Sequence, residues 1–197
     1  MAGTLDRRAL VRAVLEPRGD AVVVAGLGAP AWDITACGDG PLNLPLWGGM
    51  GGAAMLGLGL ALAQPERTVL VITGDGEMLM GLGSLATIAV QKPPNLAILV
   101  QDNERYGETG MQETHTAHGV DLLAIARGAG FADVSEIATI DQARRWRERL
   151  SGAGGPWFAL AKVAPDPLPL VLPPREGAYL QARLREALLG AEAHKQS

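Results

Sequence analysis

The apolar positions of the chain fall into short continuous runs, separated by segments with helical spacing. Residues 21–25, 69–73 and 96–101 are almost entirely apolar, and so is the segment WFALAKV at 157–163. Such runs are typical of strands that are buried on both faces of a parallel sheet. An amphipathic pattern joins 69–73 to 96–101 and ends before Pro93 and Pro94. These segments predict a parallel βαβ unit and an α/β fold.

The remaining patterns predict the other helices and the connections. Helical spacing predicts a helix at 4–16, capped by Thr4, and further helices at 32–36, 50–62, 121–129 and 141–150. Residues 37–46 read as a loop and 131–134 as a short strand. Five prolines within 164–174 predict an extended arm, and a helix with leucines on one face follows at 175–189. We expect this arm and helix to dock on another subunit in preference to the chain's own domain.

Polar residues follow both strands of the βαβ unit. Gly74, Asp75 and Gly76 come after the first strand, and Asn103 comes after the second. Because a right-handed crossover puts both strand ends on one edge of the sheet, we expect Asp75 and Asn103 to be neighbours. Mg²⁺ prefers such oxygen ligands together with phosphate oxygens and water, and glycines at a helix start let a diphosphate approach closely. The sequence therefore predicts a joint site for Mg²⁺ and a diphosphate.

A second glycine turn, GLGAPA at 26–31, follows the strand at 21–25 and raises the alternative of a nicotinamide-binding Rossmann protein. Ala31 stands where that motif favours a third glycine, and no acidic residue follows a second strand at the expected distance. The GDG segment with its downstream asparagine also has no role in such a site. The dinucleotide interpretation is therefore disfavoured.

The GDG segment at 74–76, followed by Asn103, resembles the cofactor motif of the thiamin diphosphate-dependent decarboxylase and acetolactate synthase superfamily. The segment WGGMG at 47–51 is similar to the family's G-[ST]-[MI]-G segment, and the resemblance covers roughly residues 20–163. It implies a three-layer αβα fold with a mainly parallel central sheet, and thiamin diphosphate and Mg²⁺ as cofactors. By the same resemblance Asp75, Asn103 and the carbonyl of Arg105 would bind Mg²⁺.

The resemblance assigns roles to further residues. The carbonyl of Gly48 would accept a hydrogen bond from the cofactor's aminopyrimidine, and Met50 would lie beneath the cofactor and force its rings into the bent, reactive shape. Glu108 would donate its main-chain amide to the diphosphate. Glu77 would help only through its backbone N–H, because its carboxylate would repel the diphosphate unless it turns outward or caps a neighbouring amide. The other positions of the predicted cofactor site are Gly28, Gly49, Gly74, Gly76, Tyr106, Gly107 and Thr109.

The polar loop after Asn103 distinguishes branches of the family. The segment TG-x-Q at 109–112 most resembles the decarboxylases of phosphonopyruvate and sulfopyruvate. The pyruvate decarboxylase branch has a working glutamate where Thr109 stands, so its protonation step is not transferred. His115 and His118 are three residues apart, but a zinc site would lack a third ligand. They are first interpreted as exposed loop histidines and second as contacts for an anionic 2-oxo acid.

Composition limits the partners and the compartment. The chain has 197 residues, of which 48% are hydrophobic, and its formal net charge of -4 gives no reason to expect a nucleic-acid partner. The apolar stretch 50–63 is too short and glycine-rich to span a bilayer, and no secretory signal is apparent. The single cysteine, Cys37, is interpreted as a packed thiol and fits a reducing compartment. We expect a cytoplasmic protein that binds neither nucleic acid nor a membrane.

The length of the chain predicts one cofactor domain at 1–163 and an appended arm and helix at 164–197. In the family a glutamate that activates the cofactor comes from a second, pyrimidine-binding domain. The resemblance therefore implies a separate α-type subunit that carries this glutamate, and a hetero-oligomer. The chain would be the β-type subunit of a decarboxylase for a small 2-oxo acid. The alternatives are a carboligase or oxidoreductase component on the same cofactor, or a noncatalytic cofactor-binding or regulatory subunit.

Overall fold

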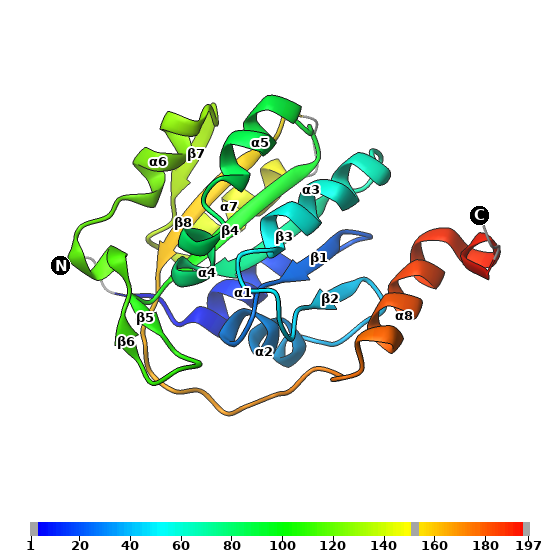
Figure 1. The fold of residues 1–197 in the computed structure, drawn as a ribbon, viewed down its shortest axis with the longest axis horizontal. Coiled ribbons are helices and arrows are strands. Elements are labelled where there is room, and N and C mark those ends of the chain that lie inside the picture. The colour runs from blue at the N-terminus through cyan, green and yellow to red at the C-terminus, as the bar shows by residue number, and fades with distance from the viewer. Residues whose placement is uncertain (1–3, 151–153, 195–197) are drawn as a thin grey trace.

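A computed structural model describes residues 4–150 and 154–194 of the chain. Its centre is a parallel sheet in the order β2-β1-β3-β4-β8-β7, with helices on both faces (Figure 1). The strands are β1 (Val22–Ala25), β2 (Asn43–Pro45), β3 (Val69–Gly74), β4 (Leu96–Asp102), β7 (Asp133–Glu136) and β8 (Trp157–Lys162). The predicted three-layer α/β class with a mainly parallel sheet is confirmed.

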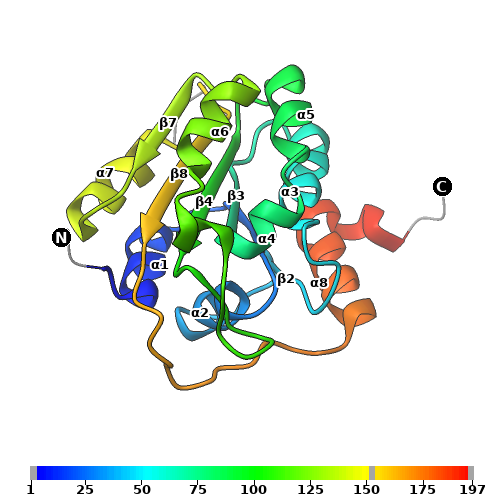
Figure 2. The same ribbon diagram turned by 60° about the vertical axis from the view of Figure 1, so that its left-hand side comes forward.

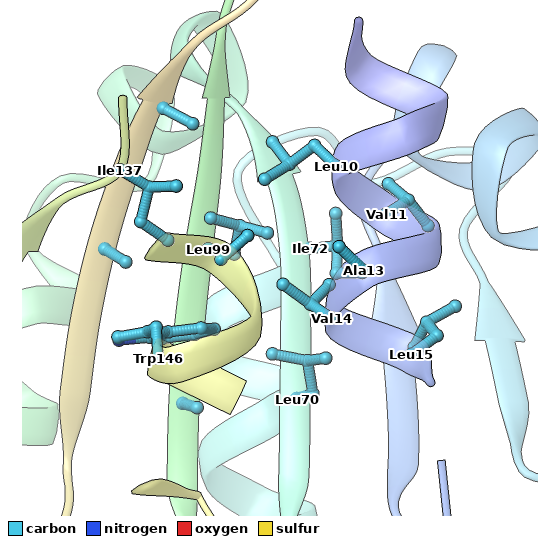
Figure 3. Close-up of a cluster of buried hydrophobic side chains, with 14 of the residues drawn as sticks. Leu10, Val11, Ala13, Val14, Leu15, Leu70, Ile72, Leu99, Ile137 and Trp146 are labelled. Atoms are coloured by element: carbon cyan, nitrogen blue, oxygen red, sulfur yellow. The ribbon is translucent and has the colours of Figure 1, made fainter. Parts of the chain in front are cut away.

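Each face of the sheet has its own buried cluster, because successive strand residues point to opposite sides. Leu70 and Ile72 of β3 pack against α1 (Arg7–Leu15), α2 (Ala29–Ala36) and α7 (Ile140–Arg149). Figure 3 shows part of this cluster, with Leu10 and Trp146 approaching the sheet from two helices. On the other face lie α3 (Ala53–Ala63), α4 (Asp75–Met80), α5 (Ser84–Gln91) and α6 (Leu122–Ala129).

The order of the strands predicts where a ligand binds. From β1 the chain moves outward to β2 and then returns to place β3 on the other side of β1. In open parallel sheets ligands bind beyond the carboxyl ends of the strands, where the winding direction reverses in this way. That place lies between the ends of β1 and β3, next to the end of β4.

Several predicted boundaries were wrong. Helix α1 begins at Arg7 and is capped by Asp6, whose carboxylate accepts from the amide of Ala9, so Thr4 is not the cap. Helix α2 begins at Ala29, and the single helix predicted after β3 is two helices, α4 and α5. The break between them contains two glycines, which are poor helix formers. The predicted loop at 37–46 ends in the edge strand β2, and the strand predicted at 131–134 is β7, at 133–136.

The loop after β4 is ordered by short elements. The strands β5 (Arg105–Tyr106) and β6 (Gln112–Glu113) form an antiparallel hairpin, and the 3₁₀ helix η1 (His115–His118) follows. Both ribbon views show the hairpin at the carboxyl edge of the sheet, beyond the end of β4 (Figures 1 and 2). The sequence predicted a polar loop here but not the hairpin.

The C-terminal segment packs on its own domain. After β8 the arm passes beneath the hairpin and α2 and reaches α8 (Gly177–Leu189) and η2 (Gly190–His194), as Figures 1 and 2 show. Leu180 and Leu184 of α8 are buried, and Arg183 forms an ion pair with Asp39 at 2.6 Å. The preference for docking on another subunit was therefore wrong.

Candidate cofactor and metal site

The ends of β3 and β4 bring the predicted metal ligands to one place. The register of the two strands pairs Gly74 with Gln101, so Asp75, one residue after Gly74, and Asn103, two residues after Gln101, lie at the same edge of the sheet. Both residues line a single cavity of about 500 Å³. The right-handed crossover of the βαβ unit thus produces the neighbourhood that the sequence predicted.

Most of the predicted cofactor residues line the same cavity: Met50, Gly74, Gly76, Glu77, Arg105, Tyr106, Gly107, Glu108 and Thr109. Gly28 is not among the lining residues, although its neighbours Leu27 and Ala29 are. Gly48 and Gly49 also lie outside the lining, on an exposed segment before α3. The structure therefore gathers the diphosphate and metal end of the predicted site and leaves its aminopyrimidine end at the surface of this chain.

Asp75 is a buried carboxylate that lines the cavity. Its side chain is 1% exposed, and its Oδ2 atom accepts from Thr114 Oγ1 at 2.5 Å and lies 3.1 Å from Thr116 Oγ1. Burial raises the pKa of the Asp75 carboxyl; the bond from Thr114 opposes this rise, and the nearby charge of Asp102 adds to it. Among the ion pairs of the described residues, Asp75 takes part in none. A buried carboxylate of this kind is suited to a cation.

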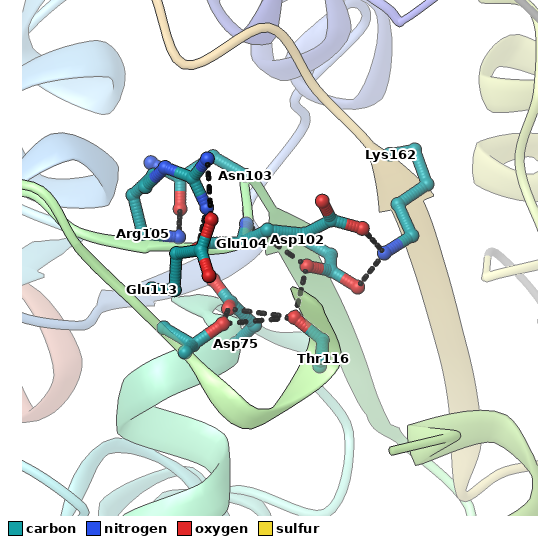
Figure 4. A network of polar contacts seen from close by, with 9 residues as sticks. Asp75, Asp102, Asn103, Glu104, Arg105, Glu113, Thr116 and Lys162 are labelled. Carbon is teal, nitrogen blue, oxygen red and sulfur yellow. Dashed lines mark hydrogen bonds and ion pairs between the residues drawn. The ribbon is translucent and has the colours of Figure 1, made fainter. Parts of the chain in front are cut away.

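Asn103 and Arg105 form a tight turn beside Asp75. The amide N–H of Arg105 donates to Asn103 Oδ1 at 3.0 Å, and Glu104 between them has a φ of 61°. This is the local hydrogen bond by which asparagine stabilises a turn. The Arg105 side chain lies 3.2 Å from Glu113 across the β5–β6 hairpin, so its charge is already paired (Figure 4). Carboxylate, amide and main-chain carbonyl oxygens are thus available at this turn.

The model of the thiamine pyrophosphate enzyme C-terminal TPP-binding domain matches residues 34–158 of the chain. The chain belongs to this family. The match runs from within α2 to the start of β8 and includes the segments that carry Asp75 and Asn103.

Relatives of this thiamin diphosphate-binding chain include named decarboxylases. It is 38% identical over 161 residues to sulfopyruvate decarboxylase subunit beta of Methanothermobacter thermautotrophicus. This alignment covers 82% of this chain and 83% of the relative. It is 36% identical over 160 residues to phosphonopyruvate decarboxylase of Streptomyces viridochromogenes. This alignment covers 81% of this chain but 40% of that longer protein. The predicted similarity to these two groups is confirmed.

Solved structures share the fold of the domain. Benzoylformate decarboxylase from Polynucleobacter necessarius superposes with a TM-score of 0.67 at 20% identity, which covers 84% of this chain and 34% of that chain. A protein of Mycobacterium smegmatis considered to be a thiamin diphosphate-dependent enzyme superposes with a TM-score of 0.72 at 22% identity, over 83% of this chain and 32% of that chain. These similarities support the arrangement of the layers.

Glu77 is a second buried carboxylate near the start of α4. Its side chain is 4% exposed, and its carboxylate accepts from the amides of Leu27 at 3.0 Å and Ala53 at 3.4 Å and from Thr73 Oγ1 at 3.1 Å. Burial raises the pKa of Glu77, and these bonds only partly offset the rise. Of the two orientations allowed for, capping of neighbouring amides is the one observed. The carboxylate joins the loops after β1 and before α3 to the start of α4.

The tip of the hairpin lies against the turn after β1. A Cβ atom placed on Gly28 would lie 2.8 Å from Glu108 Oε1, and burial raises the pKa of the Glu108 carboxyl. The positive φ of 80° at Gly28 shapes the turn that opens α2. The hairpin and this helix start therefore meet beside the cavity that residues of both segments line.

The two histidines of η1 remain outside the cavity. His118 Nε2 lies 3.2 Å from Glu113 Oε2, and both His115 and His118 are absent from the cavity lining. Within residues 4–150 and 154–194 no group of three or more His, Cys, Asp or Glu side chains is arranged to hold a metal ion. Within the same ranges no helix is long and apolar enough to cross a membrane.

Sequence reasoning missed two sets of residues. Leu168 and Leu170 of the arm line the cavity, and the buried Arg7 joins the arm to the domain by donating to the carbonyl of Asp166 at 2.8 Å. The prolines predicted an extended arm, but nothing in their pattern indicates where the arm packs. Thr114 and Thr116, which contact Asp75, were also missed, since two threonines in a polar loop have no distinguishing signal.

Proposed function

We propose that this chain is the diphosphate-binding subunit of a split thiamin diphosphate-dependent 2-oxo acid decarboxylase. The observation that carries the proposal is the placement of Asp75 and Asn103 at one cavity, on strands whose family binds this cofactor. The named relatives that match most of this chain are beta subunits of sulfopyruvate decarboxylase. Their names support both the reaction class and the division between two subunits.

Asp75, Asn103 and the carbonyl of Arg105 fit Mg²⁺. They are oxygen donors, which this hard cation prefers, and phosphate oxygens and water would complete its coordination. Asp75 is buried without an ion-pair partner in the described part of the chain, so a divalent cation would compensate its charge. Three protein oxygens are fewer than the six ligands that Mg²⁺ takes, so the protein alone does not complete its coordination. This agrees with a cation that is shared with a diphosphate.

The remaining residues of the chain would hold and shape the cofactor. Gly74 leaves open space where a side chain would lie, which permits the diphosphate to approach. The amide of Glu108 would donate to the diphosphate, and Gly28 would lie at the helix start that faces it. Met50 would support the bent shape of the cofactor, with the carbonyl of Gly48 accepting from the aminopyrimidine. When bound, the cofactor supplies the carbanion stabilisation that decarboxylation requires.

A separate α-type subunit would complete the site and contribute the activating glutamate. Gly48 and Gly49 are exposed in this chain, so the aminopyrimidine end has room for a second protein. We propose residues 1–163 as the cofactor domain, 164–197 as its appendage, and a cytoplasmic hetero-oligomer. The relatives named for sulfopyruvate and phosphonopyruvate suggest a small 2-oxo acid with an anionic tail as the substrate.

Calorimetric titration of thiamin diphosphate with Mg²⁺ tests the proposal, first on the chain alone and then on its complex with a pyrimidine-binding subunit. We expect tight binding in the complex and release of CO₂ and an aldehyde from a 2-oxo acid. Asp75→Ala should abolish Mg²⁺-dependent cofactor retention, whereas Asp20→Ala, at an exposed aspartate, should not change it. Met50→Ala should bind cofactor but turn over more slowly.

Each contrary result has a defined meaning. Normal cofactor binding by Asp75→Ala would refute the metal assignment. Binding without turnover would favour a regulatory subunit, and a product with a new carbon–carbon bond would place the reaction among the carboligases. Absence of binding in both the chain and the complex would refute the proposal.

A further inference from the structure

A buried polar network lies behind the Asp75 carboxylate, and none of its other members was assigned a function above. Thr116 Oγ1 lies 2.8 Å from Asp102 Oδ1 and 3.1 Å from Asp75 Oδ2, so it bridges the two carboxylates. Thr114 Oγ1 lies 2.5 Å from Asp75 Oδ2 and 2.9 Å from Thr116 Oγ1. Figure 4 shows Asp102 of β4, Asp75 at the start of α4 and Thr116 of η1 converging.

The far end of the network is fixed by a cation. The register of β4 and β8 places Asp102 opposite Lys162, and Lys162 Nζ lies 2.8 Å from Asp102 Oδ2 and 2.5 Å from Glu104 Oε1. Asp102 is 2% exposed, and within the described ranges Lys162 is the one cation that forms an ion pair with it. The second buried carboxylate is therefore compensated inside the protein, while Asp75 is not.

Counting hydrogens shows what this arrangement does. A threonine hydroxyl has one hydrogen to donate, and the two threonines take part in four close oxygen–oxygen contacts. Thr114 donates its hydrogen to Asp75, and the single hydrogen of Thr116 is shared between Asp102 at 2.8 Å and Asp75 at 3.1 Å, so both hydroxyls act on Asp75. Both contacts to Asp75 fall on Oδ2, so neither hydroxyl engages Oδ1.

We propose that Thr114 and Thr116, anchored by the Asp102–Lys162 ion pair, are positioning residues that orient the Asp75 carboxylate for Mg²⁺. This inference rests on the proposed function, since it concerns the same cation. The hydroxyls hold one carboxylate oxygen, so the other keeps a fixed direction relative to Asn103. Hydrogen-bond partners of a metal ligand commonly change metal affinity 10–100-fold when they are removed.

The test measures Mg²⁺ binding, by calorimetry, to the two-subunit complex with saturating thiamin diphosphate. Thr116→Val removes the bridging hydroxyl at nearly constant volume, and we expect Mg²⁺ affinity to fall by about 10–100-fold. Thr116→Ser keeps the hydroxyl and should restore the affinity. Thr68→Val is the matched control, because it removes a hydroxyl that bonds the Leu150 carbonyl at the opposite end of β3.

The serine variant distinguishes positioning from a general loss of stability. Thr116→Val removes the hydroxyl, whereas Thr116→Ser removes the methyl group and keeps the hydroxyl, so only a role of the hydroxyl predicts different Mg²⁺ affinities for the two variants. If Thr116→Val does not fold, Thr114→Val and Thr114→Ser decide the matter by the same comparison. Equal Mg²⁺ affinity of wild type and the valine variants would overturn the inference and leave the proposed function intact. A wild-type complex that takes up no Mg²⁺ would overturn both.

Discussion

The packing of Glu77 against Gly26 leads to a prediction that can be worked out from distances. A Cβ atom at position 26 would overlap Glu77 Oε2 and lie 2.8 Å from Glu77 Cδ and 2.9 Å from Thr73 Oγ1. Glu77 is 4% exposed and its carboxylate accepts three hydrogen bonds, so any movement of the carboxylate would lengthen bonds to buried donors. Gly26→Ala must therefore push the carboxylate away from its donors.

The expected cost has two parts. Overpacking of a buried site costs about 1–3 kcal/mol, and weakening a hydrogen bond to a charged group costs about 1.5–3 kcal/mol. We expect Gly26→Ala to lower the free energy of unfolding by about 3–5 kcal/mol, and Glu77→Ala, which leaves buried donors unpaired, to cost about as much. In the Glu77→Ala background only Thr73 Oγ1, which has lost its bond to Glu77, remains close to the new methyl group, so Gly26→Ala should then cost about 1–2 kcal/mol.

Urea unfolding of wild type, both single variants and the double variant, followed by circular dichroism, measures this coupling. We expect the two substitutions to be non-additive by about 2–3 kcal/mol, in the range found for residues in direct contact. Additivity within about 0.5 kcal/mol would refute the packing argument, because independent sites behave in that way. Since domains are commonly stable by about 5–15 kcal/mol, the single variants should remain folded.

Three further predictions concern the rest of the domain. Gly57→Ala would place a methyl group in overlap with Val71 Cγ2 and should lower the free energy of unfolding by about 1–3 kcal/mol. Gly59→Ala, on the same helix, places its methyl group in open space and should raise that free energy by about 0.5–1 kcal/mol. Urea unfolding measures both changes, and changes of the same sign would contradict this prediction. Trp146→Ala should lower the free energy of unfolding by about 3–5 kcal/mol. Trp146→Phe should lower it much less, because the buried Nε1 has no hydrogen-bond partner to lose among the described residues. Equal decreases in melting temperature of the two variants would contradict this prediction. Burial raises the pKa of Asp39, but Arg183 outweighs it and holds that pKa below its ordinary value. Asp39→Asn should therefore lower the free energy of unfolding by about 1 kcal/mol at pH 7. This difference from wild type should vanish as the pH falls below about 4 through the folded-state pKa of Asp39. Unfolding curves of both proteins at several pH values measure it.

The sequence was sufficient for the βαβ unit and for the proximity of Asp75 and Asn103 at its edge. The runs at 69–73 and 96–101 could be recognised because a strand buried on both faces is apolar throughout, and this signal is local. The proximity of Asp75 and Asn103 then followed from the handedness of the crossover, which does not depend on sequence detail. By contrast, β2 is a three-residue edge strand that ends in Pro45, so it has neither the length nor the alternation that identifies a strand.

The Glu77 carboxylate was expected to turn outward or to cap a neighbouring amide, and the spacing within α4 explains why it caps amides. Asp75 and Glu77 lie two residues apart in α4, and residues with that spacing do not share a helix face. Asp75 therefore faces the cavity network, and the Glu77 carboxylate points toward the amides of Leu27 and Ala53. A helical wheel applied from Gly74 onward would have separated the two carboxylates.

Long-range partners could not be predicted in the same way. The leucines of α8 show that one face is buried, but the partner of Arg183 is Asp39, which lies far away in the sequence. The same holds for Thr114 and Thr116, whose hydroxyls reach Asp75 only because the β5–β6 hairpin returns the chain to the end of β3. Single-sequence patterns describe faces and turns, whereas such contacts depend on how loops close.

The uneven burial of the predicted cofactor residues bears on how the binding energy is divided. At the proposed metal and diphosphate end Asp75 is buried, whereas Gly48 and Gly49 at the proposed aminopyrimidine end are exposed. A chain with this arrangement should retain part of its affinity for the diphosphate when alone and gain the remainder from contacts that a second protein makes with the aminopyrimidine. Each tenfold gain in affinity on adding the partner corresponds to about 1.4 kcal/mol. The test compares the binding of inorganic diphosphate and of thiamin diphosphate, each with Mg²⁺, to the chain with and without the partner. If the partner increases the affinity for thiamin diphosphate but not for inorganic diphosphate, the gain comes from the aminopyrimidine end, as the exposure of Gly48 and Gly49 predicts.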